Sequence, residues 1–269
     1  MHVHLIGDVD RDRPATSAGR YYGRAGGGEP VEWQIASEAA IAFVVNGEAF
    51  AVMMATPEDL VDFAVGFLVS ERIIRRADDI VELRLLPIEH GYAINCVLED
   101  RLARRAKGRA RRLVGQSGCG LCGAETIAHA LPQLPSVRGQ LPRPAAVMEA
   151  MDRFGGLQPM NARNRSTHGA AFFALADNTP IAVREDVGRH NALDKVGGAL
   201  LRSGVDPREG FLVISSRMSV EMVQKAIIFG APLLVSLSAP TDLALATARR
   251  YGLAVAARAG EGVVYFWPS

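Results

Sequence analysis

The sequence predicts an α/β protein, and two observations lead to that prediction. From Phe211 onward, short apolar segments alternate with amphipathic helical segments, and the chain then closes with two strand-like segments at 253–258 and 263–267. Earlier in the chain, two apolar segments at 40–45 and 49–54 lie on either side of an Asn-Gly turn, as in a β-hairpin. Strands and helices in this succession imply a sheet with helices packed on its faces.

The composition is that of an ordinary globular protein. Among 269 residues, 30 Lys and Arg balance 29 Asp and Glu, and 49% of residues are hydrophobic. This balance argues against a disordered chain and against a nucleic-acid partner. No apolar run reaches the roughly 18–20 residues that span a bilayer, and the start lacks the pattern of a signal peptide. With three clustered cysteines, we expect a cytoplasmic protein with no membrane partner.

The chain divides into three parts. Residues 1–30 are expected to form a flexible tail, because Arg, Gly and Pro are mixed there without an apolar period, and ordered sequence is expected to begin near Val31. Residues 31–140 are predicted to form an α+β region. Residues 141–269 are predicted to form an α/β domain, after a proline-rich boundary near 135–145.

The elements of the α+β region can be justified in order. Strands at 40–45 and 49–54 flank Asn46-Gly47, the preferred pair for a two-residue hairpin turn. A helix should follow, with Thr56 as its N-cap and a proline at its first position. Two further strands are expected within 80–98, and Cys96 in the second should be a small buried hydrophobe.

The sharpest motif is SGCGLCG, which places Cys119 and Cys122 in a Cys-x-x-Cys spacing between glycines. Such a loop suits a nucleophilic thiolate or a pair of metal ligands. A structural zinc site needs four ligands, so Cys96 and a histidine would have to complete it. A zinc deaminase needs His-x-Glu upstream, but Gly91 and Tyr92 follow His90.

A thioredoxin-like dithiol is the remaining alternative, and it should follow a strand and open a helix. The residues before Cys119 are instead basic and glycine-rich, which favours sulfur chemistry on a loop. Seven of the twelve residues at 101–112 are basic. They could dock an acidic protein or a polyphosphate and lower the pKa of a neighbouring thiol, or they could form a solvated helix face.

A second polar cluster lies in REDVGRHNALDKVGGALL, at residues 184–201. The apolar residues after His190 predict a helix, and the backbone N–H groups at its start can bind an anion. The alternative is a capped helix with a structural ion network. The polar residues before and within the first turn are Glu185, Asp186, Arg189, His190 and Asn191.

A third cluster follows the strand that begins at Phe211. Ser215, Ser216 and Arg217 lie at the carboxyl end of this strand, where open α/β sheets bind ligands. Ser219 fits a helix N-cap equally well. His168 precedes a predicted strand, and a single histidine in that position is more often structural than catalytic.

Taken together, these segments resemble the formate dehydrogenase accessory proteins, the sulfurtransferases of the FdhD type. The resemblance runs from about residue 46 to residue 246 and rests on four stretches in the family's order: NGEAFAVMMATPEDLVDFAVGFLVSE, SGCGLCGAE, REDVGRHNALDKVGGALL and SSRMSVEMVQKAIIFGAPLLVSLSAPTDLALA. The resemblance implies a cytidine-deaminase-like three-layer fold, with helices on both faces of a sheet and an added N-terminal α+β subdomain.

The resemblance also implies an activity. Such proteins accept persulfide sulfur from a cysteine desulfurase and pass it to molybdenum bis(molybdopterin guanine dinucleotide), a bound substrate, for formate dehydrogenase apoprotein. Cys119 would carry the persulfide and Cys122 would assist relay or release. A homodimer without a permanently bound metal is implied. The segment assigned to the guanine nucleotide matches Ala256, Ala257, Arg258, Ala259, Gly260 and Glu261, with His168, Arg189, Ser215 and Arg217 as further candidates.

The alternative within the same resemblance is a chaperone that holds the cofactor without transferring sulfur. The two hypotheses differ in whether the cysteines are needed. A plain hairpin turn remains the alternative for Ala256, Ala257 and Ala259.

Overall fold

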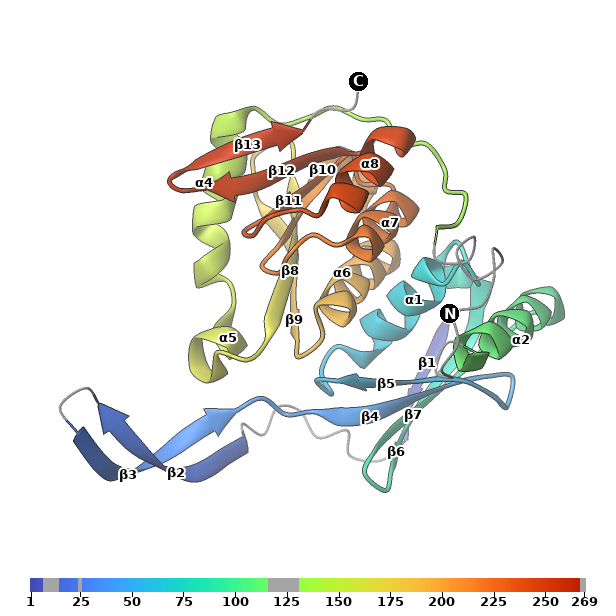
Figure 1. Ribbon diagram of the computed structural model, residues 1–269. Coiled ribbons are helices and arrows are strands. Elements are labelled where there is room, and N and C mark those ends of the chain that lie inside the picture. Colours follow the sequence, from blue (N-terminus) through green and yellow to red (C-terminus); the bar gives the residue numbers. More distant parts are fainter. Residues whose placement is uncertain (7–14, 24–25, 116–130, 267–269) are drawn as a thin grey trace.

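Two large sheets and a two-stranded ribbon organise the protein in the computed structural model, which describes residues 1–6, 15–23, 26–115 and 131–266 (Figure 1). The first sheet has the strand order β1-β6-β7-β4-β5, and the second has the order β13-β12-β11-β10-β8-β9. Strands β2 and β3 pair only with each other within the described residues.

Four strands of the five-stranded sheet, β4, β5, β6 and β7, form where the sequence predicts them. Asn46 and Gly47 both have positive φ, 48° and 81°, as a type I′ hairpin turn requires. The predicted pair at 80–98 is antiparallel. The elements of this half are β1 (His2–Leu5), β4 (Ala39–Val45), β5 (Glu48–Ala55), α1 (Leu60–Ser70), a short 3₁₀ helix (Ala77–Asp79), β6 (Ile80–Ile88), β7 (Gly91–Leu98) and α2 (Asp100–Gly115).

The predicted N-cap of the first helix is wrong. Helix α1 begins at Leu60, and Asp59 is its cap residue. Thr56 is buried and serves another element: its backbone N–H donates to Asp186, and its hydroxyl accepts from the N–H of Val187. Local propensity predicts that the Thr56 side chain caps the helix. Thr56 instead hydrogen-bonds to a segment about 130 residues away in the sequence.

From β10 onward, the six-stranded sheet follows the predicted order of strands and helices. Strands β10, β11 and β12 are parallel, while β8, β9 and β13 pair antiparallel. Among the described helices, none is both long and apolar enough to cross a membrane. The elements are α4 (Pro144–Gly156), α5 (Pro159–Asn164), β8 (His168–Ala174), β9 (Pro180–Asp186), α6 (Arg189–Ser203), a 3₁₀ helix (Pro207–Glu209), β10 (Gly210–Ile214), α7 (Val220–Phe229), β11 (Leu233–Ser236), α8 (Asp242–Tyr251), β12 (Ala254–Ala259) and β13 (Gly262–Phe266).

Alternate side chains of the six-stranded sheet enter two different cores. Phe173 and Phe211 stack face to face under α4, whereas their neighbours Phe172 and Leu212 belong to the core shared with α6, α7 and α8. Figure 1 shows α4 on one side of the sheet and these three helices on the other. The predicted α/β architecture with helices on both faces is therefore confirmed.

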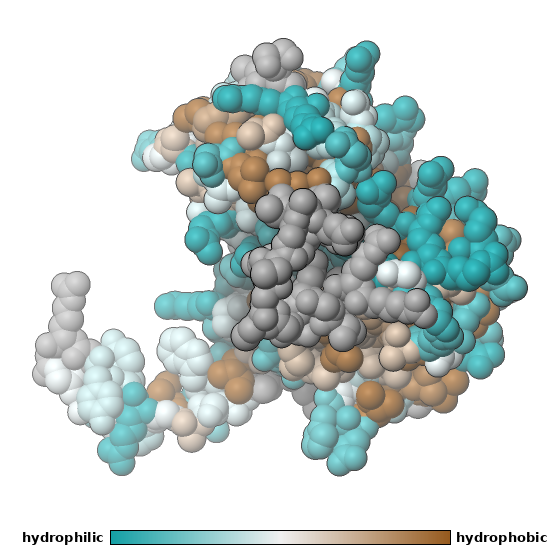
Figure 2. Space-filling model, turned by 45° about the vertical axis from the view of Figure 1, so that its right-hand side comes forward, coloured by the Kyte–Doolittle hydropathy of each residue, from teal (hydrophilic) through white to brown (hydrophobic). Residues whose placement is uncertain are grey.

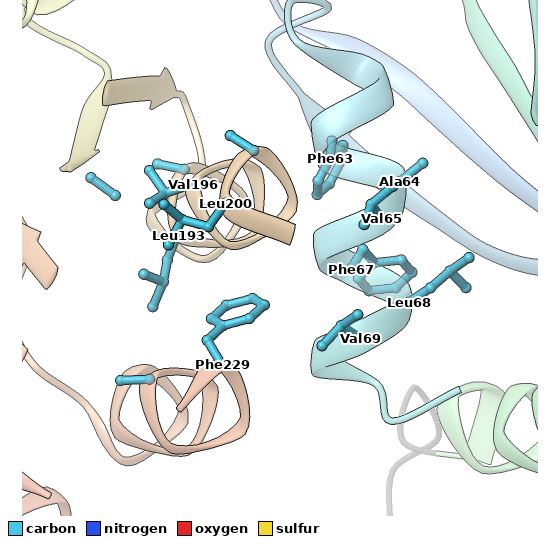
Figure 3. Packing of buried hydrophobic residues seen from close by; sticks show 14 of the residues in the cluster. Phe63, Ala64, Val65, Phe67, Leu68, Val69, Leu193, Val196, Leu200 and Phe229 are labelled. Carbon is cyan, nitrogen blue, oxygen red and sulfur yellow. The ribbon is translucent and has the colours of Figure 1, made fainter. Parts of the chain in front are cut away.

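Helices α1 and α6 join the two sheets. Figure 3 shows the apolar side chains of α1 beside those of α6, with Phe229 at the end of α7 close to both. A side chain cannot fit where the helices cross: a Cβ on Gly66 would lie 1.8 Å from the carbonyl oxygen of Asp194, and one on Gly198 would lie 1.9 Å from that of Asp62. The core is consequently continuous across the boundary expected near 135–145.

The expectation that ordered sequence begins near Val31 is wrong. Strand β1 pairs in parallel with β6 at the sheet edge. Strands β2 (Ala15–Gly23) and β3 (Gly26–Ile35) form an antiparallel ribbon. Glycines and Pro30 interrupt the apolar period along the sequence, and the alternation becomes visible only when the two strands are aligned.

Candidate functional site

The predicted sulfur-carrying pair, Cys119 and Cys122, lies outside the described residues. The described chain stops at the end of α2 and resumes at Leu131. Just beyond that point the chain is tied to α8, because the Tyr251 hydroxyl donates to the carbonyl of Pro132 at 3.3 Å. The N–H of Val137 donates to the carbonyl of Tyr251 at 2.7 Å.

Helix α2, which precedes the cysteine pair, uses several of its basic side chains structurally. Lys107 pairs with Glu48 at 2.7 Å, and Arg109 pairs with Glu71 at 2.7 Å. Arg105 donates to the backbone carbonyls of Arg72 and Ile73, just after the end of α1. Arg101 and Arg104 are exposed. Several basic side chains of α2 therefore belong to a structural network of ion pairs and hydrogen bonds. The exposed Arg101 and Arg104 are still available to contact an acidic partner.

Cys96 is buried, as predicted. Its side chain is 1% exposed, and burial raises the pKa of its thiol to about 12. Cys96, on the inner face of β7, is therefore unsuited to act as a thiolate nucleophile. In the residues that the structure describes, no group of three or more His, Cys, Asp or Glu side chains could hold a metal ion.

The burial of Cys96 gives a direct prediction. In native protein at pH 8, iodoacetamide should leave Cys96 unmodified, because the thiolate is the reactive form and reagent has no access. In 8 M urea the same residue should be alkylated. Peptide mass mapping of the two samples provides the measurement, and rapid native labelling of Cys96 would contradict the described packing.

Three candidates from the second and third clusters meet at one edge of the six-stranded sheet. Ser215 follows β10, and its hydroxyl accepts from the N–H of Gly169 at 2.9 Å, directly after His168. Arg189 begins α6 after the cap residue Gly188. Burial, and after it the charge of Arg189, lowers the pKa of His168, while Asp186 acts in the opposite direction.

Arg189 has an unsatisfied donor in this edge cluster of His168, Arg189, His190 and Ser215. Its Nε is buried without a hydrogen-bond partner in the structure. An unpaired buried donor costs roughly 1–3 kcal/mol, so the atom is suited to an acceptor from outside the chain. Helix N-termini favour anions, which makes an anionic acceptor the best match.

His190 lies beside Arg189 and is surrounded by further charge. Burial, followed by Lys225 and Arg189, lowers its pKa to about 4, while Glu221 acts in the opposite direction. Lys225 was not predicted as part of this cluster. The available signal was the single lysine of the mostly apolar helix VEMVQKAIIF. In the structure Lys225 pairs with buried Asp194 at 2.6 Å.

The lowered pKa of His190 predicts a pH-dependent stability. Between about pH 6.5 and pH 4 the unfolded chain binds a proton that the folded chain does not, so stability should fall as pH falls through this window. The His190→Gln variant should show a weaker loss. Urea midpoints of both proteins across the window test this, and parallel curves would be evidence against a neutral buried histidine.

The other polar residues of the second cluster are structural. Glu185 accepts the backbone N–H groups of Met160 and Asn161 at 2.9 and 2.7 Å. Asp186 is fully buried, pairs with Lys195 at 2.7 Å and accepts from Asn191 at 2.9 Å. Glu185, Asp186 and Asn191 therefore form a structural network of ion pairs and hydrogen bonds, which is the alternative that the sequence left open.

The remaining candidates do not join the edge cluster. Arg217 is exposed. Ser219 is the N-cap residue of α7, as predicted, but its hydroxyl donates to the Glu221 carboxylate and makes no capping bond to a backbone N–H. In the 256–261 segment, Ala256 and Ala257 are buried within β12. Arg258 pairs with Asp152 of α4 at 2.6 Å, on the opposite side of the sheet from α6.

The end of that segment is accessible. Ala259, Gly260 and Glu261 are exposed, and Gly260 has a positive φ of 59° in the turn before β13. The turn at 259–261 and half-buried Arg258 can therefore contact a ligand. Buried Ala256 and Ala257 belong to the strand that supports this turn.

Known proteins match the chain over most of its length. The model of the FdhD/NarQ family matches residues 36–266. A protein named sulfur carrier protein FdhD from Agrobacterium fabrum is 41% identical over 229 residues, covering 84% of each chain. One of the same name from Xanthomonas euvesicatoria is 42% identical over 251 residues, covering 91% of this chain and 88% of that one.

A solved structure shares the fold. A crystal structure described as that of a formate dehydrogenase accessory protein from Desulfotalea psychrophila aligns with a TM-score of 0.73 at 23% identity, covering 94% of this chain and 96% of that one. The fold agreement and the family match extend over both sheets. The chain belongs to the FdhD/NarQ family.

Proposed function

We propose that this protein is a sulfur carrier that takes persulfide sulfur from a cysteine desulfurase and transfers it to molybdenum bis(molybdopterin guanine dinucleotide) for formate dehydrogenase. The observation that supports this most strongly is the family match, joined to relatives at about 40% identity that are named sulfur carrier proteins. The Cys119-x-x-Cys122 motif supplies the thiols, since buried Cys96 does not.

The chemistry needs one nucleophile and one resolving thiol. The Cys119 thiolate attacks the terminal sulfur of the donor persulfide, the donor S–S bond breaks, and the desulfurase thiolate leaves. Cys122 can then attack the inner sulfur of the Cys119 persulfide. That step forms a disulfide and releases hydrosulfide, which the cofactor accepts, and a thiol reductant restores the cysteine pair.

The edge cluster is the proposed place for a phosphate of the cofactor's guanine nucleotide. The unpartnered Nε of Arg189, the start of α6 and the Ser215 hydroxyl together offer donors to an anion. His168 lies beside them. The exposed turn at 259–261 is a second proposed contact, with Arg258 available if it exchanges its exposed partner Asp152 for phosphate.

Reconstitution tests this function. Formate dehydrogenase apoprotein, loaded with cofactor in the presence of this protein, a desulfurase and L-cysteine, should gain activity together with cyanide-labile sulfur on the cofactor. Omitting the desulfurase should remove both. Equal activity and equal labile sulfur without the desulfurase would instead support the chaperone that only holds the cofactor.

A further inference from the structure

A groove lies between helix α2 and the β4–β5 hairpin, and we call it the α2 groove. It encloses about 690 Å³, a size typical of small-molecule sites in proteins. Figure 1 shows α2 beside the turn of this hairpin. Figure 2 turns that side of the molecule forward and shows hydrophilic side chains over most of its right-hand part, with smaller apolar areas below. None of the described residues that line the groove belongs to the edge cluster or to the 256–261 segment.

The α2 groove has an apolar lining made mostly of short side chains. Three alanines of α2 recur at helical spacing and form one wall, and three residues of the hairpin form the other. Because protein interiors are normally close-packed, a hollow of this size between two elements requires short side chains on at least one wall. The apolar lining residues are Ala103, Ala106 and Ala110 of α2, with Val45, Ala49 and Phe50 of the hairpin.

The hairpin wall of the groove is held in place independently of α2. Asn46 donates from its side-chain amide to the carbonyl of Leu98 at 2.9 Å, and its side-chain oxygen accepts from the N–H of Leu98 at 2.7 Å. These two bonds fix the hairpin turn to the end of β7. A ligand therefore meets a preformed wall, and binding loses little free energy in ordering it.

Four charged side chains line the groove, and two of them are cations available to a ligand. Lys107 of α2 and Glu48 of β5 pair from opposite walls at 2.7 Å, and their side chains are 52% and 59% exposed. Asp100 lies in the first turn of α2, where the helix dipole stabilises a negative charge. Arg104 is exposed, and no described residue pairs or hydrogen-bonds with it.

We propose that the α2 groove binds a small amphipathic carboxylate. Its aliphatic body lies against the alanine wall, and its carboxylate meets the guanidinium of Arg104, which can bind it with two parallel hydrogen bonds. Lys107 joins by exchanging Glu48 for the ligand. That exchange costs little, because an exposed ion pair contributes at most about 1 kcal/mol. This ligand site is separate from the proposed sulfur transfer.

The dimensions favour a small ligand over a folded protein partner. Eleven described residues line the groove, whereas a stable protein interface takes about 20–30 residues from each side. The lining stretch of α2 runs from Asp100 to Ala110, which is about 15 Å along the helix axis. An extended aliphatic chain with one charged end can follow a groove of this length.

Isothermal titration calorimetry with decanoate, below its critical micelle concentration, tests the proposal. Decyltrimethylammonium has the same chain with a positive head group, and it should bind at least about tenfold more weakly than decanoate. Arg104→Met should weaken decanoate binding by about tenfold, the usual effect of losing a hydrogen bond between charged groups. Glu48→Gln should tighten it by about two- to fivefold, because Lys107 then has no competing carboxylate.

Arg101→Met is the matched control, because Arg101 is an exposed arginine of the same helix that does not line the groove. Its decanoate affinity should stay within about twofold of wild type. Ala103→Trp fills the groove and should abolish binding. Arg104 and Glu48 are exposed, so thermal melts of their variants should match wild type even if Ala103→Trp is unstable.

No decanoate binding to the wild-type protein, equal binding of the two probes, or an equal loss in the two arginine variants would overturn the proposal. The measurement uses neither a desulfurase nor formate dehydrogenase, so each of these results leaves the sulfur-transfer proposal untouched.

Discussion

Cys119→Ala should reduce the maturation of formate dehydrogenase to the level seen without this protein. The physical reason is that the persulfide needs a thiolate to form, and no other side chain at that position offers a polarisable nucleophile of comparable reactivity. Dehydrogenase activity and cyanide-labile sulfur should fall together. Both can be measured after reconstitution with the purified variant.

Cys96→Ala is the matched control. Cys96 is buried, and its thiol has a pKa raised to about 12, so its removal should leave sulfur transfer close to wild type. Cys122→Ala tests whether Cys122 is the resolving thiol. If it is, the Cys119 persulfide should still form in this variant but should persist, because no second thiol releases its sulfur. Full activation by Cys119→Ala would support the chaperone hypothesis and end the carrier hypothesis.

Lys195→Met should destabilise the fold by about 3–5 kcal/mol, the usual effect of breaking a buried ion pair from one side. Lys195 and Asp186 are both fully buried, 2.7 Å apart. The lysine also donates to the carbonyl of Thr56 at 2.9 Å. Without it, the Asp186 carboxylate stays buried without its counter-ion between the two halves of the chain. Urea unfolding measures the change.

Lys107→Met provides the comparison. Lys107 and Glu48 are also 2.7 Å apart, but their side chains are 52% and 59% exposed. Solvent screens such a pair, and its removal should cost less than about 1 kcal/mol. If the two variants lost similar amounts of stability, the buried position of the Lys195–Asp186 pair would not be the reason for its effect.

The sequence predicted those elements whose cause is local. The Asn46-Gly47 hairpin depends on two residues that tolerate positive φ, and the α7 and α8 helices end at glycines that do the same. Burial of Cys96 followed from its place in an alternating strand. Each of these features is determined by residues that are close to it in the sequence.

Features set by distant contacts could not be predicted in this way. Thr56 carries a good N-cap side chain, yet it hydrogen-bonds to the segment at 186–187. The ribbon at 15–35 is recognisable only when two glycine-containing strands are paired. Within the candidate site, residue types predicted a polar cluster correctly. Which of these polar residues pair with Asp186 and which, like Arg189, keep an unpaired donor could not be predicted, because tertiary contacts decide it.

Mass spectrometry of the intact protein tests the central claim most directly. After incubation with a cysteine desulfurase and L-cysteine, the account predicts an added mass of about 32 Da, one sulfur atom, that maps to Cys119 and disappears on treatment with a thiol reductant. The Cys119→Ala protein should remain unmodified. An adduct of equal yield in that variant, or no adduct on wild-type protein from an active desulfurase, would contradict sulfur carriage by Cys119.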